Sequence, residues 1–171
     1  MKKTNLLAIL IIISTLLSSC SSDDSQENSI CGEIIDQPAK GVFRGFNFTV
    51  TGGDFRSQFD EYFCRIHVFE VTGGSCTFPE FEPIQGSIIF SLSNLSPQTI
   101  TLSDVLGEGE SLNFNTIETI DNESVTIVEL ATCGKIEITE ASETMIIGRV
   151  VATGQKGSTI NGNFTLDLCQ N

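Results

Sequence analysis

Hydrophobic and polar residues alternate with a period of two along most of the chain from Gly41 onward. No long stretch has the 3.6-residue period of an amphipathic helix. In the segment STINGNFTLDLC, for example, Ile160, Phe164 and Leu166 fall on one side of an extended chain, and Asn163 falls on the other. This pattern predicts an all-β fold in which antiparallel strands each bury one face.

The alternation predicts about nine strands, separated by turns rich in Gly, Ser, Asn and Asp. They lie near residues 42–51, 62–72, 86–93, 98–103, 111–119, 124–131, 135–140, 144–153 and 158–168. The last three are expected to form a meander. Two Gly pairs, at residues 52–53 and 73–74, are expected to make tight turns. Nine such strands suit an antiparallel β-sandwich, with a lipocalin-like β-barrel as the alternative.

The N-terminal residues follow a different pattern. A short positively charged start precedes an apolar run at residues 6–17, which is too short to span a membrane and is typical of a signal peptide. The run ends in LSSC, residues 17–20, which resembles the lipobox of bacterial lipoproteins. The resemblance implies that a leader at residues 1–19 is cleaved and that Cys20 is the lipid attachment site. The alternative is a secreted protein in which Cys20 joins a disulfide.

Serines and aspartates follow the lipobox directly. Ser22, Asp23 and Asp24 resemble the export signal of surface-exposed lipoproteins of the Bacteroidota, in which a short acidic cluster sends the protein to the outer face of the outer membrane. The rival interpretation is that residues 20–30 serve only as a hydrophilic, flexible tether. The C-terminal strand pattern is also similar to uncharacterised β domains of small Bacteroidota lipoproteins, which implies no site.

Residues 31–171 have the length of one ordinary domain. The chain has 22 acidic and 9 basic residues, and two of the basic residues lie in the leader, so the mature chain carries 7 minus 22, or −15. A protein that binds nucleic acid needs a positively charged surface, so we do not expect this chain to bind nucleic acid. The acidic residues are spread over strands and turns, which favours a role in solubility over an acidic binding site.

Five cysteines are left for the domain if Cys20 is lipidated, namely Cys31, Cys64, Cys76, Cys133 and Cys169. An exported chain meets an oxidising environment, so we expect disulfides and, because five is odd, one free thiol. In the C-terminal meander Cys133 and Cys169 lie at opposite ends of their strands, too far apart to be bridged. We therefore expect Cys169 to pair with Cys31. No C-x-x-C spacing occurs, which disfavours zinc.

Candidate catalytic groups are few. His67 is the only histidine and lies in a strand-like segment, and Cys64 falls on the opposite face of that segment, which keeps the thiol from the imidazole. No nucleophile elbow, zinc-protease helix or phosphate-binding loop occurs, so we expect no catalytic residue, no metal and no cofactor. The weaker candidates are paired carboxylates among Asp60, Glu61, Glu80 and Glu82, and a calcium site at Asp121, Asn122 and Glu123.

The aromatic residues are twelve Phe, one Tyr and no Trp. Sugar-binding surfaces usually present Trp or Tyr, so glycan binding is disfavoured, and the Phe residues indicate a dense core or an apolar cavity. We expect a non-enzymatic, lipid-anchored binding or accessory protein of the outer membrane that faces the exterior. Its partners are the membrane, through the anchor, and an unknown protein or small ligand. The alternatives are a lipocalin-like carrier of a small apolar ligand and, third, a hydrolase.

Overall fold

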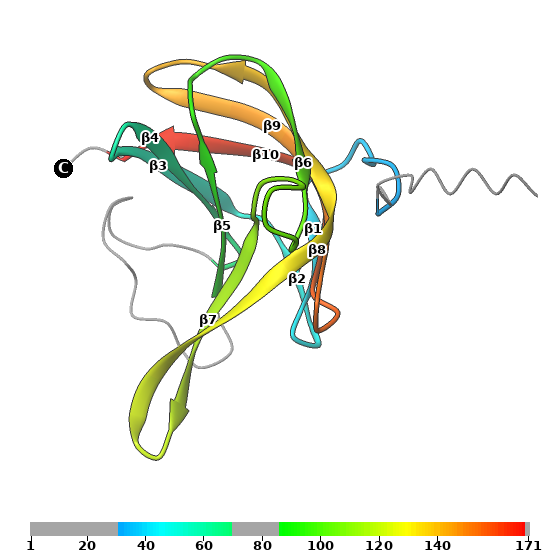
Figure 1. The fold of residues 1–171 in the computed structure, drawn as a ribbon, viewed down its shortest axis with the longest axis vertical. Coiled ribbons are helices and arrows are strands. Elements are labelled where there is room, and N and C mark those ends of the chain that lie inside the picture. Colours follow the sequence, from blue (N-terminus) through cyan, green and yellow to red (C-terminus); the bar gives the residue numbers. More distant parts are fainter. Residues whose placement is uncertain (1–30, 70–85, 170–171) are drawn as a thin grey trace, which may run out of the picture.

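The computed structural model describes residues 31–69 and 86–169, and the regular structure within them is entirely β-strand, as predicted (Figure 1). The ten strands are β1 (Lys40–Phe43), β2 (Phe46–Thr49), β3 (Gly52–Gln58), β4 (Glu61–His67), β5 (Gly86–Leu92), β6 (Gln98–Leu102), β7 (Asn113–Ile120), β8 (Glu123–Ala141), β9 (Met145–Gly154) and β10 (Thr159–Leu168). The predicted meander at the end of the domain is confirmed as β8, β9 and β10.

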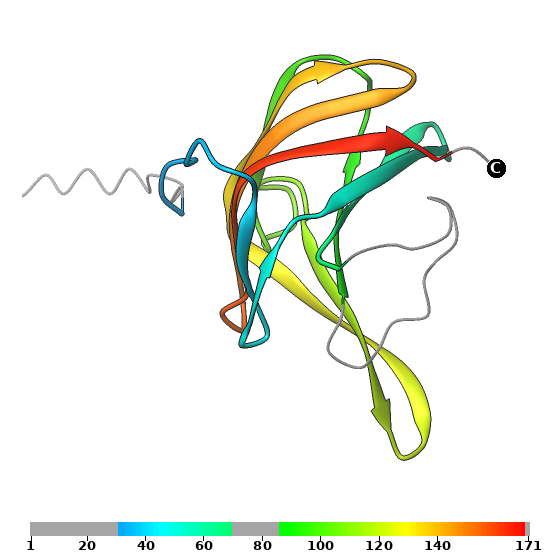
Figure 2. The same cartoon turned by 180° about the vertical axis from the view of Figure 1, so that it is seen from behind.

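All ten strands belong to one sheet, in the order β2-β1-β10-β3-β4-β5-β7-β8-β6. β9 pairs with both β10 and β8, so the sheet returns on itself. The pairings among the described strands are antiparallel except for that of β10 with β3. The sheet thus wraps around a single core, in the manner of the predicted sandwich but as one continuous sheet (Figures 1 and 2).

β8 replaces two of the predicted strands with a single strand of 19 residues. Its register shifts between Ala131 and Cys133 and again between Ile138 and Glu140, which is the mark of β-bulges. Before the first shift β8 pairs with β7, and after it with β9 and β6. Because a bulge bends a strand, β8 can serve these different neighbours in turn.

The first strands also differ from the prediction. The segment predicted as one strand at residues 42–51 is the hairpin of β1 and β2, which turns at Arg44 and Gly45 with positive φ angles. Gly52 and Gly53 do not form the predicted turn but open β3, which the sequence pattern missed. At Gly53 a Cβ atom would overlap the side chain of Leu166, so close packing explains this glycine better than turn geometry does.

Aromatic and aliphatic side chains fill the core. The rings of Phe43 and Phe114 pack at a tilt with centroids 6.1 Å apart, and those of Phe90 and Phe164 meet edge to face at 5.9 Å. Tilted and edge-to-face contacts are the favourable geometries for aromatic pairs. Phe55, also fully buried, belongs to the same core. The expected dense core is thus present.

Two phenylalanines depart from that expectation. Phe46 is 52% exposed and Phe59 is 90% exposed. Phe59 lies in the turn between β3 and β4 with a φ of 52°, and Asp60 follows it with a φ of 65°. Bulky side chains rarely adopt this left-handed conformation. The first third of the chain therefore contributes both core and exposed aromatic residues.

One disulfide joins Cys31 to Cys133, with Cα atoms 5.6 Å apart, so the predicted pairing of Cys31 with Cys169 is wrong. The reason is the direction of β10. Asn161, near its start, accepts a hydrogen bond from the backbone of Ile35 and so lies beside the N-terminal segment. Cys169 lies eight residues further along, about 27 Å in extended chain, where its N–H donates to the carbonyl of Phe55 at 2.8 Å.

Candidate functional site

Three ionisable side chains lie together on the outer face of β3 and β4. The core-facing positions of these strands hold apolar groups, so Asp54 on β3 and Arg65 and His67 on β4 point to the other side. Arg65 donates from Nε and Nη2 to Asp54 Oδ2 at 3.1 and 2.5 Å. The Nε2 of His67 lies 2.7 Å from the same oxygen. The three residues are only 3–5% exposed, so this is a buried polar cluster.

The charge of Asp54 is stabilised within this cluster. Burial raises the pKa of its carboxyl, but hydrogen bonds from His67 and Arg65 and the charges of both groups lower it by more, so the net pKa lies below the usual value. Asp54 therefore carries a negative charge at neutral pH that offsets the charge of Arg65. The hydrogen bonds join β3 to β4, and removing either charged partner would leave the other buried and unpaired.

A histidine with an aspartate partner is also half of a catalytic triad, so the position of any nucleophile matters. Cys64 points into the core, on the opposite face from His67, as predicted. Burial and, secondarily, the charge of Asp54 raise the pKa of the Cys64 thiol to about 12. Ser87 is opposite His67 in the ladder, but the described contacts include no hydrogen bond between the two. The arrangement favours a structural role.

The predicted leftover thiol is Cys64, which is free and buried. Cys133 is bonded to Cys31, and Cys169 is also disulfide-bonded, so the expectation that Cys133 and Cys169 do not pair is confirmed. Cys76 lies outside the described residues.

Other predicted positions fall on turns or outside the described part of the chain. Asp60 lies in the exposed β3–β4 turn, and Glu61 is the first residue of β4. Asp121 and Asn122 form the β7–β8 turn with φ angles of 53° and 65°, and Glu123 is the first residue of β8. In residues 31–69 and 86–169, no three metal-ligating side chains are grouped as a metal site requires. The positions outside the described residues are Cys20, Ser22, Asp23, Asp24, Glu80 and Glu82.

A second buried carboxylate was not found from the sequence. Glu129 on β8 is 2% exposed and accepts hydrogen bonds from the backbone of Lys156 at 2.6 Å and of Ser158 at 3.1 Å. The hydroxyl of Ser158 donates to its other oxygen at 2.7 Å. These bonds hold the β9–β10 turn against β8. The sequence alone would place Glu129 on the surface, because its hydrogen-bond partners are far from it along the chain.

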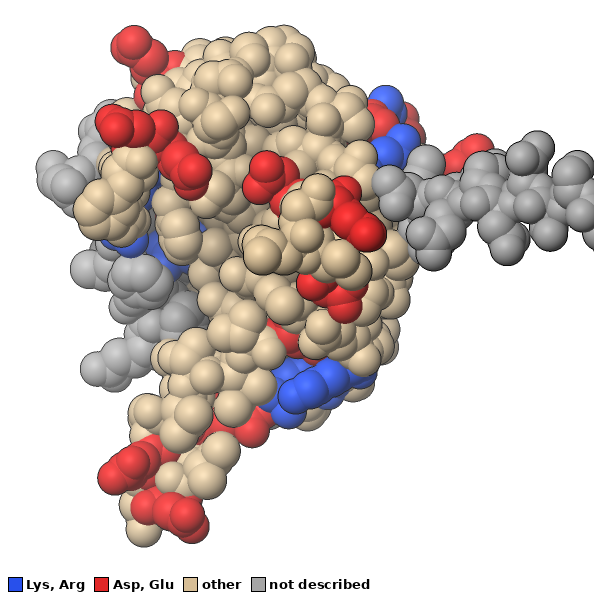
Figure 3. Space-filling view, viewed as in Figure 1, with Lys and Arg blue, Asp and Glu red and all other residues tan. Residues whose placement is uncertain are grey.

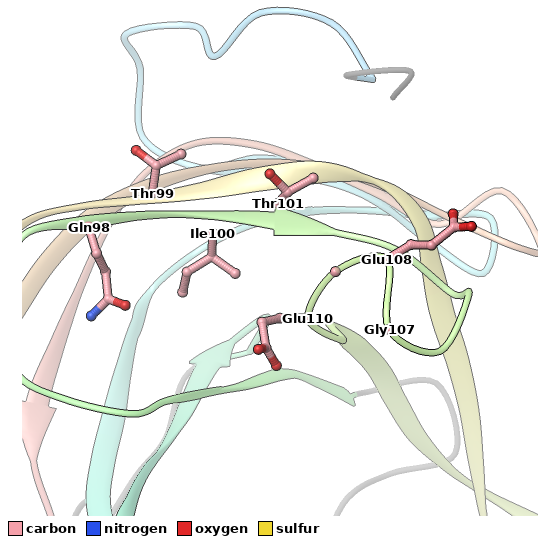
Figure 4. A pocket seen from close by; sticks show the side chains of 8 residues that line it. Gln98, Thr99, Ile100, Thr101, Gly107, Glu108 and Glu110 are labelled. Carbon is pink, nitrogen blue, oxygen red and sulfur yellow. The ribbon is translucent and has the colours of Figure 1, made fainter. Parts of the chain in front are cut away.

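The surface is hollowed beside β6, where a groove of about 470 Å³ follows the strand. Residues Gln98 to Thr101 line one side, and residues 107–110 of the loop after β6 line the other (Figure 4). Thr99 and Thr101 point to one face of the strand, and Ile100 points to the other (Figure 4). Acidic side chains surround this loop at the front of Figure 3. No pattern in the sequence predicts this groove.

Comparison with known proteins adds no relative: no family model, curated protein or solved structure matches the chain. Within the described residues, no helix has the length and apolar character needed to cross a membrane.

Proposed function

We propose that the protein is a lipid-anchored, non-enzymatic binding or accessory module of the outer membrane that faces the exterior. The observation that carries the proposal is LSSC at residues 17–20, placed directly after the apolar run and followed at once by serines and aspartates. Residues 20–30 are the hydrophilic tether between this motif and the β-domain. Cys20 carries the lipid, and Asp23 and Asp24 direct export.

The anchor has a physical consequence. Each buried methylene contributes about 0.8 kcal/mol, so a single acyl chain binds a membrane marginally, whereas two or more chains hold it stably. In the bacterial lipoproteins that the motif resembles, the cysteine carries a thioether-linked diacylglycerol and its new N-terminus is acylated, which makes three chains. Three chains on Cys20 keep the protein on one membrane permanently. The mature chain has a formal charge of 7 minus 22, or −15, which repels anionic headgroups, so the domain extends away from the bilayer.

The packing of the domain supports a binding module over the two alternatives. A carrier of an apolar ligand needs an internal cavity, whereas in the core Phe43 packs against Phe114 and Phe90 packs against Phe164. A hydrolase using His67 needs a nucleophile beside it, and the thiol of Cys64, three residues earlier on β4, faces the core.

Lipidation is tested by labelling cells of a Bacteroidota host with radioactive palmitate. We expect the wild type and the control Ser21→Ala to take up label and to be found in the outer membrane. Cys20→Ala should take up none and stay unprocessed in the inner membrane. If Cys20→Ala is cleaved and exported as the wild type is, the anchor proposal fails.

Surface exposure is tested by adding protease to intact cells. The wild type and a control with Gln26→Ala and Asn28→Ala, which alters the tether but not the acidic pair, should be degraded. A variant with Asp23→Ala and Asp24→Ala should be protected. Equal degradation of all three would show that the acidic pair does not direct export.

A further inference from the structure

β6 lies at one end of the strand order and pairs, among the described strands, only with β8. In an antiparallel pair, alternate residues direct both backbone groups to the partner strand or away from it. The carbonyl of Thr101 accepts from the N–H of Glu110 at 3.0 Å, and the N–H of Ser103 donates to the carbonyl of Glu110 at 3.1 Å. These bonds lie on the side away from β8. The backbone N–H and C=O groups of the odd-numbered residues of β6 therefore point away from β8.

Three backbone groups on that outer side are left without a partner within the described residues. They are the N–H and C=O of Thr99 and the N–H of Thr101, as the alternation of the ladder requires. Glu110 occupies the edge for one residue only, through a parallel bridge to Leu102. This bridge shows that the edge accepts an extended chain, and the remainder of the edge is open.

The groove described above follows this same open edge. Natural proteins usually blunt an open edge with charged side chains, proline or a covering loop. No residue of β6 is charged or proline. The two residues whose backbone groups point away from β8, Thr99 and Thr101, are exposed. The loop covers only the end of the strand near Leu102.

We propose that the open edge of β6 binds an extended peptide segment of a partner protein by strand addition, and that this segment carries lysine or arginine. Added strands gain affinity from backbone hydrogen bonds and specificity from side-chain contacts. Glu108 and Glu110 line the groove and supply the complementary charge. A second copy of this acidic chain would be repelled. The inference rests on the proposed function for the access of the partner to the domain at the cell surface.

The binding is tested with the full chain in detergent and three blocked, fluorescent heptapeptides. One alternates lysine and valine, one alternates glutamate and valine, and one is the lysine peptide with every backbone nitrogen methylated, so that neither of its edges can donate. We expect the lysine peptide to bind at least about tenfold more tightly than either of the others. Equal binding of the methylated peptide, or no binding of the lysine peptide up to about 1 mM, overturns the proposal.

A substitution locates the site. Thr99→Pro removes an outward N–H, whereas the ladder to β8 is made by Gln98 and Ile100 and stays intact. We expect binding of the lysine peptide about tenfold weaker than for the matched control Thr99→Ala, with the same urea midpoint. Equal binding by the two variants overturns the assignment to β6. If Thr99→Pro does not fold, a variant with Glu108→Gln and Glu110→Gln is measured in its place. Unchanged affinity of that variant for the lysine peptide then overturns the assignment.

These outcomes do not depend on palmitate labelling. If Cys20 proves not to be lipidated, the affinity for the lysine peptide is unaffected. If the lysine peptide does not bind, the evidence for lipidation of Cys20 is unaffected.

Discussion

Replacing Asp54 by asparagine is expected to lower the free energy of unfolding by about 3–5 kcal/mol at pH 7, because it removes one partner of a buried ion pair. Three hydrogen bonds converge on Asp54 Oδ2, two from Arg65 and one from His67. Bonds to a charged group contribute about 1.5–3 kcal/mol each, but they share one oxygen and are not additive. The loss would be a large part of the stability of an ordinary domain, about 5–15 kcal/mol.

A double-mutant cycle with urea unfolding measures this coupling directly. The variants are Asp54→Asn, Arg65→Met and the two combined. We expect the double variant to be less destabilised than the sum of the single variants by at least about 2 kcal/mol, because it no longer buries a charge whose counter-ion has been removed.

Glu137 provides the matched control, since it too has two basic partners. Lys135 and Arg149 contact its carboxylate at 2.6 Å, but their side chains are 27% and 46% exposed. Ion pairs at such sites contribute about 0–1 kcal/mol, so Glu137→Gln should cost little. If Asp54→Asn costs no more than Glu137→Gln, or if the cycle shows no coupling, the buried cluster does not hold β3 to β4 as argued.

Three further predictions follow from the same structure. The pKa of Asp54 is lower in the folded chain than in the unfolded chain, so the stability that its charge contributes is complete above about pH 4 and is lost as the pH falls through the folded pKa. In urea titrations, the free energy of unfolding should therefore fall more steeply with acid for the wild type than for Asp54→Asn. At pH 8 only about one Cys64 in ten thousand is thiolate, so a thiol reagent should label it no faster than the chain unfolds, with Cys64→Ser as the blank. Phe59→Asn should stabilise the domain by about 1 kcal/mol in thermal unfolding, because asparagine tolerates the left-handed turn; a loss of stability would show that the exposed ring makes contacts.

The parts of the fold that depend on local alternation could be predicted from the sequence. The bounds of β10 could be predicted to within one residue because its buried and more exposed positions alternate along the strand, and those of β9 because turn residues flank it on both sides. β3 was missed because Gly52 and Gly53 look like a turn, and the need for a small residue there comes from Leu166 on a distant strand. The single long β8 was divided because a bulge interrupts the alternation at Ala131.

Only part of the buried cluster of Asp54, Arg65 and His67 could be predicted from the local sequence pattern. His67 stood out as the only histidine, and the period of a strand placed Cys64 on the other face. Asp54 could not be linked to it, because the link needs the register of β3 against β4. The partner of Cys31 likewise depends on the course of β10, which the order of strands in the sequence does not reveal.

The disulfide also determines how a pulling force would enter the domain. Cys31 precedes β1 and is bonded to Cys133, within the long strand β8. Tension applied to the chain before Cys31 would pass through the sulfur atoms to β8 and bypass the four-residue β1. β8 is held by β7, β9 and β6. A protein tethered by its N-terminal segment would therefore resist detachment with the hydrogen bonds of its longest strand, while the β1–β2 hairpin would bear no load.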